Sequence, residues 1–305
     1  MRLSVALGQW RDRPPGEAVR TAQLADQHGY PEVWVGERST YDAFALATAI
    51  GTRTAQIAIT VGPLAVGVRD PAMIAMGAAS VAELTGRRVN VAIGASKPMV
   101  VEEWHGRSHA GAVAALRASA EALRPMLAGR EDTGFPLRLP APHSELTVAA
   151  FGPEALRVAA GADRMVINLL TPELAARLIT DLRLLTSTTR VAAWVTAAVD
   201  PDEAALARLR RALVPFLATP RYAAMFAEAG FADVVAYAGT GPSAETLAGA
   251  IPDALLESVA LLGDSVEIMD RLDAYAEAGV DEVALVPIST ENDPCGEATL
   301  KALAG

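Results

Sequence analysis

The chain has 305 residues, of which 51% are hydrophobic, so it can bury a large core, and we expect a single domain over residues 1–305. Its 36 acidic and 26 basic residues give a net charge of −10, and no local basic stripe is present, which argues against a nucleic-acid partner. The single cysteine excludes an internal disulfide framework, and without a signal peptide or a membrane-length apolar run we expect a cytoplasmic protein with no membrane partner.

Short apolar runs alternate with helix-compatible segments along most of the chain. The runs are rich in branched residues, and several are apolar on both faces, which is typical of parallel strands. The predicted strands are 3–7, 32–35, 57–61, 89–93, 146–150, 164–168, 190–199 and 282–286. The predicted helices are 15–28, one beginning near 42, 70–85, 111–127, 153–161, one beginning at 171, 264–278 and 297–303. Eight alternating units predict an α/β fold, the (β/α)8 TIM barrel.

Several helix boundaries carry explicit capping signals. Asp42 and Asp70 can accept the free amides of a first helical turn, and Pro71 suits the first helical position. Thr171 followed by proline predicts another start, while Gly86 predicts a helix end because glycine adopts the left-handed conformation at low cost.

Three segments depart from the alternation. Residues 97–107 show no periodicity and predict a loop, and residues 134–144 hold three prolines and predict irregular surface chain. Residues 200–262 predict a largely helical insertion between the seventh and eighth strands.

Active sites of such barrels lie at the carboxyl ends of the strands, which nominates the residues at each predicted strand exit. These candidates are Gln9, Trp10, Glu37, Arg38, Leu64, Ala65, Ala95, Ser96, Phe151, Gly152, Asn168 and Thr196. Gly94 is one of the glycines that recur at these exits, and Lys97 lies just beyond the fourth strand. Trp10 can stack on a ligand ring or serve as wall packing. Glu37 and Arg38 can form an acid/base and anion-holding pair or a partly solvated ion pair.

Weaker signals point to anions, covalent chemistry and metals. Phe151 and Gly152 precede a predicted helix start, a candidate phosphate cradle with Arg157 one turn inside. Lys97 can form a Schiff base if it is desolvated, but a solvated cation is the favoured interpretation. His105 and His109 have i, i+4 spacing without a third ligand nearby, so we expect no metal site.

Five segments in order and at fitting spacing resemble the luciferase-like monooxygenase superfamily, and within it the coenzyme F420-dependent oxidoreductases. They are AQLADQHGYPEVWVGE (22–37), FALATAIGTRTAQIAITVGPLAV (44–66), RDPAMIAMGAASVAELTGRRVNVAIG (69–94), FGPEALRVAAGADRMVIN (151–168) and DRLDAYAEAGVDEVALVP (270–287).

The resemblance implies a deazaflavin lying across the barrel mouth. It implies a bulge in the third strand with a non-proline cis peptide, which matches the Leu64–Ala65 bond. The matched cofactor-binding residues are Leu64, Ala65, Gly94, Ala95, Ser96, Ala150, Phe151, Gly152 and Asn168, and the expected substrate-binding residues are Gln9, Trp10 and Lys97.

Two departures from the family concern acid/base chemistry. Relatives that act on sugar phosphates carry histidine at the position of Arg38 and glutamate at the position of Lys97, so that substrate is disfavoured here. Glu37 and Arg38 are the expected catalytic residues, with Arg38 holding an anion or ordering water because arginine keeps its proton.

The first hypothesis is an enzyme that moves a hydride between deazaflavin C5 and a small organic substrate, reducing a C=C, C=N or C=O bond. The alternatives are a monooxygenase that uses FMN, a non-catalytic ligand-binding relative and, last, a lysine-based lyase. The resemblance also implies a homodimer.

Overall fold

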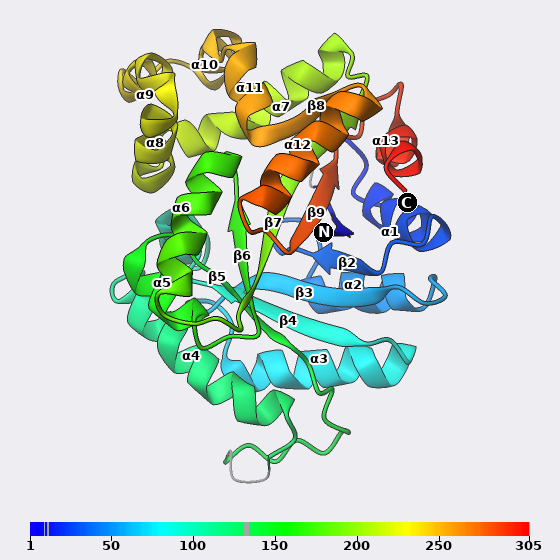
Figure 1. The fold of residues 1–305 in the computed structure, drawn as a ribbon. Coiled ribbons are helices and arrows are strands. Elements are labelled where there is room, and N and C mark those ends of the chain that lie inside the picture. Colours follow the sequence, from blue (N-terminus) through cyan, green and yellow to red (C-terminus); the bar gives the residue numbers. More distant parts are fainter. Residues whose placement is uncertain (9, 11, 131–133, 305) are drawn as a thin grey trace.

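The computed structural model describes residues 1–8, 10, 12–130 and 134–304, which form a closed barrel of parallel strands surrounded by helices (Figure 1). The barrel strands are β1 (Arg2–Ala6), β2 (Glu32–Val35), β3 (Ala58–Ala65), β4 (Val89–Gly94), β5 (Leu146–Ala149), β6 (Arg164–Asn168), β7 (Arg190–Val199) and β9 (Glu282–Pro287). Strand β1 pairs with β2 and β9, β9 pairs with β7, and β7 pairs with β6, so the cylinder closes. The predicted (β/α)8 barrel is confirmed.

Helices alternate with the strands and cover the outside of the cylinder. They are α1 (Glu17–Gln27), α2 (Ala43–Gly51), α3 (Pro71–Thr85), α4 (Ala112–Leu127), α5 (Pro153–Ala159), α6 (Pro172–Arg183), α12 (Ser265–Glu277) and, after the short turn η4 (Pro294–Gly296), α13 (Glu297–Ala302). Helix α13 packs beside α1 (Figure 1), so the last described helix covers the same side as the first. None of the described helices is both long and apolar enough to cross a bilayer.

The predicted capping signals are confirmed. The Asp42 carboxylate accepts hydrogen bonds from the Phe44 and Ala45 amides at the start of α2, and Asp70 accepts that of Ala72 at the start of α3. Gly86 closes α3 in the left-handed conformation, with φ of 66°.

The insertion after β7 gathers at one end of the molecule (Figure 1, yellow-green to orange). It contains α7 (Glu203–Leu217), α8 (Pro220–Phe226), η3 (Ala227–Phe231), α9 (Ala232–Gly239), α10 (Ala244–Ala250) and α11 (Asp253–Val259). The prediction of a largely helical segment missed its last element, β8 (Ala260–Gly263), which pairs with residues 196–199 of β7. Since β6 pairs only with residues 190–194 of β7, the longer strand leaves an edge that β8 occupies.

A second correction concerns residues 97–107, which were expected to be a loop. Residues Met99–Trp104 form one turn of π-helix, η1, whose wider spacing of hydrogen bonds does not produce the 3.6-residue pattern of an α-helix. The predicted irregular stretch 134–144 contains neither helix nor strand.

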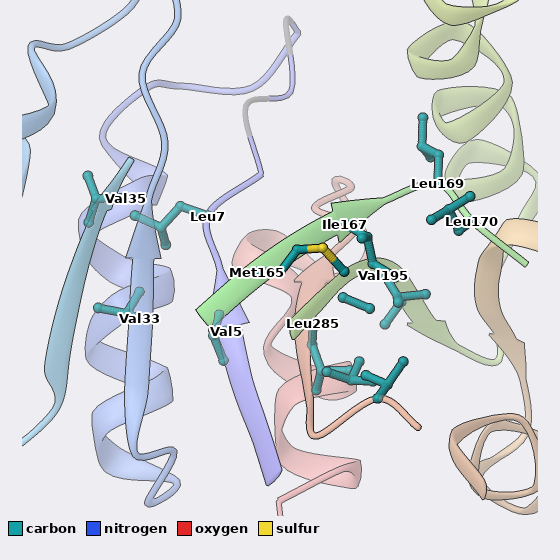
Figure 2. Packing of buried hydrophobic residues seen from close by; sticks show 14 of the residues in the cluster. Val5, Leu7, Val33, Val35, Met165, Ile167, Leu169, Leu170, Val195 and Leu285 are labelled. Atoms are coloured by element: carbon teal, nitrogen blue, oxygen red, sulfur yellow. The ribbon is translucent and has the colours of Figure 1, made fainter. Parts of the chain in front are cut away.

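Side chains alternate between the two sides of the barrel wall. Those facing the helices are larger apolar groups such as Val5, Val33 and Met165, which Figure 2 shows among their buried neighbours. The apolar side chains that face inward are mostly alanines, which leave room for Trp34 and Trp194, whose rings meet edge to face at 5.7 Å. These two rings fill the interior beneath the carboxyl ends of the strands.

Candidate active site

A cavity of about 1090 Å³ opens at the carboxyl ends of the barrel strands. Pockets that hold small molecules span about 300–1,000 Å³, so this one has room for a cofactor together with a substrate. The predicted residues that line it are Trp10, Glu37, Arg38, Leu64, Ala65, Gly94, Ala95, Ser96, Lys97, Ala150, Phe151 and Asn168. Gly152 is not part of this lining, and Gln9 lies outside the described residues.

One wall of the cavity is the bulge in β3. The pairing of β3 with β4 shifts between Val61 and Leu64, and the bond between Gly62 and Pro63 is cis. The expectation of a cis bond at Leu64–Ala65 is therefore wrong. Leu64 and Ala65 have already returned to regular pairing with β4, and in the bulge the two residues Gly62 and Pro63 stand opposite the single residue Ala92.

The residues along this wall, on β3 and at the end of β4, have small side chains. Ala65 follows the bulge on β3, and Gly94 and Ala95 face the cavity at the end of β4. Gly94 packs so closely on β5 that an added Cβ would lie 3.2 Å from that of Ala149. Such a surface allows a planar ring to approach the backbone.

Glu37 is paired with Arg69 of the loop before α3. Arg69 Nε donates to Glu37 Oε2 at 2.7 Å, and Arg69 Nη2 donates to the other carboxylate oxygen and to Asp42. Glu37 also accepts the amide of Ala43 at 3.1 Å. The carboxylate is thus held by a cation that the sequence did not point to, since Arg69 lies outside the predicted strand exits.

Lys97 is not the solvated cation that the sequence favoured. Its side chain is half-buried, and its Nζ lies 3.5 Å from the ring centroid of Phe216 and 5.7 Å from that of Tyr222. Burial, with a smaller contribution from the charge of Arg38, lowers the pKa of Lys97 to about 8.

Aromatic side chains from the insertion form one wall of the cavity, and they were not among the predicted site residues. Tyr222 of α8 stacks on Phe151 with centroids 5.0 Å apart and meets Phe216 of α7 edge to face at 4.9 Å. Burial raises the pKa of Tyr222 despite a hydrogen bond to Asn168, which ties the wall to the end of β6. The only sequence signal for this wall is the cluster of aromatics within the insertion.

Arg221 lies against the predicted phosphate cradle. Its Nη1 donates to the Phe151 carbonyl oxygen at 2.6 Å, and an added Cβ on Gly152 would lie 1.7 Å from that nitrogen. Arg221 also lines the cavity, whereas Arg157, the cation expected there, does not. The cation beside this turn therefore comes from α8 and not from α5.

Trp10 and His109, which line the cavity, each contact a backbone carbonyl oxygen. Trp10 Nε1 donates to the Pro287 carbonyl oxygen at 3.1 Å, which fixes the indole in the cavity wall. A ring nitrogen of His109 lies 3.2 Å from the Ser96 carbonyl oxygen. Across the described part of the chain, no three His, Cys, Asp or Glu side chains gather as metal ligands would.

Comparisons with known proteins agree with this architecture. A relative in Mycobacterium tuberculosis, provisionally named as a coenzyme F420-dependent oxidoreductase, is 28% identical over 156 residues, which are 51% of this chain and 44% of that protein. The match thus spans less than half the length of that relative.

Solved structures with low sequence identity share the whole fold. The F420-dependent tetrahydromethanopterin reductase of Methanopyrus kandleri has a TM-score of 0.80 at 17% identity, covering 100% of this chain and 98% of its own. An F420-dependent secondary alcohol dehydrogenase with an F420–acetone adduct has a TM-score of 0.77 at 18% identity, with both chains covered completely. The oxygenating constituent of the 3,6-diketocamphane monooxygenase of Pseudomonas putida, in complex with FMN, has a TM-score of 0.72 at 14% identity, covering 100% of this chain and 97% of its own.

The family model described as luciferase-like monooxygenase matches residues 3–282 of the chain. That span contains the bulged third strand, the glycine-ended fourth strand and the insertion that builds the aromatic wall. The chain belongs to the luciferase-like monooxygenase family.

Proposed function

We propose that this protein is a coenzyme F420-dependent oxidoreductase that transfers a hydride between the deazaflavin and a small organic substrate, reducing a C=C, C=N or C=O bond. The observation that carries the proposal is the large cavity with a flat, small-residue wall along the β3 bulge and the end of β4. The name of the M. tuberculosis relative supports the choice of cofactor.

The residues present fit such a cofactor. Leu64, Ala65 and Gly94 would lie behind the ring, and Ala95 and Ser96 would contact the ring or its ribityl chain. Phe151 and the adjacent turn would lie near the phosphate, where Arg221 adds a cation. Deazaflavin in this position supplies a hydride donor or acceptor at its C5.

The protein's own groups orient the reactants and keep the site dry. Trp10, Phe216 and Tyr222 present apolar surface to the cavity, which limits water near the reacting atoms. Arg69 fixes the Glu37 carboxylate, and the neighbouring Arg38 can polarise a substrate oxygen or order a water molecule. These walls would hold a substrate close to the bound ring, which would favour direct transfer.

Parallel titrations with oxidised F420 and FMN test the proposal. We expect F420 to bind at least about tenfold more tightly than FMN, a difference of about 1.4 kcal/mol. Ala65→Phe places a ring in the cavity and should abolish F420 binding, while Ala298→Phe, at an exposed site on α13, should leave it unchanged. Preference for FMN would favour a monooxygenase, and binding of neither cofactor would favour a non-catalytic relative.

The same proposal includes a small-molecule substrate and a homodimer. Light scattering of the purified protein tests the assembly, since a dimer doubles the 31.7 kDa mass of the chain.

A further inference from the structure

Lys97 stands apart from the other charged groups of the cavity. It follows the end of β4, its amine lies over the Phe216 ring, and in the described chain no acidic side chain forms an ion pair with it. The chain has only one other lysine, Lys301, which is exposed on α13. A half-buried amine without an acidic partner is costly to keep charged, and its position therefore needs a functional reason.

Each carboxylate in the described lining of the cavity accepts a hydrogen bond from an arginine. Glu17 accepts from Arg13 and from the Ser289 hydroxyl, and Glu37 and Asp42 accept from Arg69. The partners of Glu17 and Asp42 together outweigh burial and lower the pKa of both carboxyl groups, so neither is a proton donor near neutral pH, while Glu37 is held by two hydrogen bonds from Arg69.

The remaining titratable groups of the lining are less suited to proton transfer. Tyr222 is hydrogen-bonded to Asn168, and burial raises its pKa. Tyr41 and His105 are exposed, and His109 is half-buried and engaged with the Ser96 carbonyl oxygen. Arginine keeps its proton under these conditions. Lys97 is the group whose proton is both near the aromatic wall and available.

We propose that Lys97 is the general acid of the reaction, donating a proton to the substrate when the substrate is reduced and accepting one in the reverse direction. This inference rests on the proposed function and adds to it the group that completes the reaction.

The atoms and electrons balance as follows. In a carbonyl reduction, the substrate carbon receives the hydride, with its two electrons, that reduced deazaflavin supplies, and a C–H bond forms. The π pair of the C=O bond moves to oxygen, which takes a proton as a Lys97 N–H bond breaks and an O–H bond forms. The substrate gains a hydride and a proton. Reduced deazaflavin would give up two electrons with the hydride and one ring N–H proton to the solvent, and neutral Lys97 regains a proton from the solvent, so charge and hydrogen balance.

The electrostatic surroundings suit this role. Arg38, after β2, acts on Lys97 through its charge, and the Tyr222 ring of α8 lies 5.7 Å from the Lys97 amine. His109, at the Ser96 carbonyl oxygen, and Arg221 of α8 line the same cavity. With burial as the main cause, the pKa of Lys97 is lowered to about 8. Acids with a pKa near the working pH are the most effective proton donors.

Nuclear magnetic resonance of protein labelled with 15N at the lysine side chain measures this directly and needs no substrate. With two lysines the spectrum holds two amine signals, and Lys97→Met and Lys301→Met assign them. We expect the Lys97 signal to titrate with a pKa near 8, below the ordinary lysine value of about 10.4. A Lys97 midpoint near 10.4 would overturn the proposal.

Turnover then tests proton transfer, with reduced F420 as donor and cyclohex-2-en-1-one as the probe acceptor. We expect Lys97→Met to lower kcat/KM by about 100-fold or more, and Lys97→Arg not to restore it, because arginine keeps the charge but yields no proton. The reduction catalysed by the unchanged protein should slow above pH 8, where Lys97 loses its proton, and this limb should be absent in Lys97→Met. Lys301→Met is the matched control and should behave like the unchanged protein.

The outcomes separate the two proposals. Loss of turnover in Lys97→Met with unchanged F420 affinity supports Lys97 as the acid, and rescue by Lys97→Arg would show a role in charge alone and overturn it. Failure of the unchanged protein to bind F420 would contradict the proposed function, while an ordinary Lys97 titration in a protein that binds F420 would contradict only this inference.

Discussion

Arg164 is fully buried inside the barrel, yet all three of its side-chain nitrogens have partners. It pairs at 2.8 Å with Glu32 and at 2.8 Å with Glu282, and its guanidinium lies 4.1 Å from the centre of the Trp34 ring. Arg2 contacts Glu32 from the rim, so two cations and two carboxylates balance. Burial disfavours the charged form of Glu32, but Arg164, Thr60 and Arg2 together outweigh it, and the pKa of Glu32 is lowered. This cluster lies at the amino-terminal end of the strands, away from the cavity.

Arg164→Met should destabilise the protein by about 3–5 kcal/mol, because it leaves two buried carboxylates without their cation. Urea unfolding followed by circular dichroism measures the change. A variant that also carries Glu32→Gln and Glu282→Gln should recover part of the loss, since the unpaired charges are gone. A change below 1 kcal/mol for Arg164→Met alone would contradict a structural role for the pair.

For single residues of the site, the sequence predicted their place in the cavity but not their interaction partners. The rule that barrel sites lie at strand exits placed Glu37, Arg38 and Lys97 around one cavity. It did not reveal that Glu37 pairs with Arg69, 32 residues away, or that Lys97 lies under aromatic rings of the insertion. Such partners depend on tertiary contacts that local pattern does not encode, and the roles assigned to these residues stay predictions.

At the scale of elements, the bulge in β3 shapes the flat wall of the cavity. Gly62 has φ of 120°, and an added Cβ there would lie 2.1 Å from the Ala92 carbonyl oxygen of β4. Glycine is therefore required at this position both by conformation and by the close approach of the neighbouring strand.

Gly62→Ala should lower the free energy of unfolding by about 1–3 kcal/mol through backbone strain and crowding, and it should weaken F420 binding because the wall must shift. Gly16→Ala is the matched control, because Gly16 has φ of −63° and open space around it, and a gain of about 0.4–1 kcal/mol is expected there. Unfolding curves and cofactor titrations of both variants provide the measurement. Equal stability of the two would contradict this account of the bulge.

The elements that sequence predicted best are those with local start and stop signals. Helix α3 begins after Asp70 and ends at Gly86 because both caps act within one turn of the chain. The missed elements lack such signals: η1 does not follow the α-helical period, and β8 is a strand because β7 offers it a free edge. The predicted position of the cis bond was wrong by two residues. The position of the bulge follows from the pairing of β3 with β4, which the sequence of β3 alone does not give.

At the scale of the whole molecule, the closed barrel and the insertion each form part of the cavity wall. The strand ends provide the small-residue wall, and α7 and α8 bring Phe216, Arg221 and Tyr222 over the same opening. Alternation of strands and helices was enough to predict the barrel, but not where a long insertion would fold back. The part of the site at the strand ends could therefore be predicted from the sequence, whereas the part formed by α7 and α8 could not.

The central claim is direct hydride transfer from the deazaflavin to an organic substrate bound in this cavity. Reduced F420 with both C5 hydrogens replaced by deuterium tests it most directly, with cyclohex-2-en-1-one as acceptor and mass spectrometry of the product. The account predicts one deuterium in each product molecule, a primary isotope effect on the hydride-transfer step and no oxygen from O2. A product that carries an oxygen atom from labelled O2, or no deuterium from C5, would contradict it.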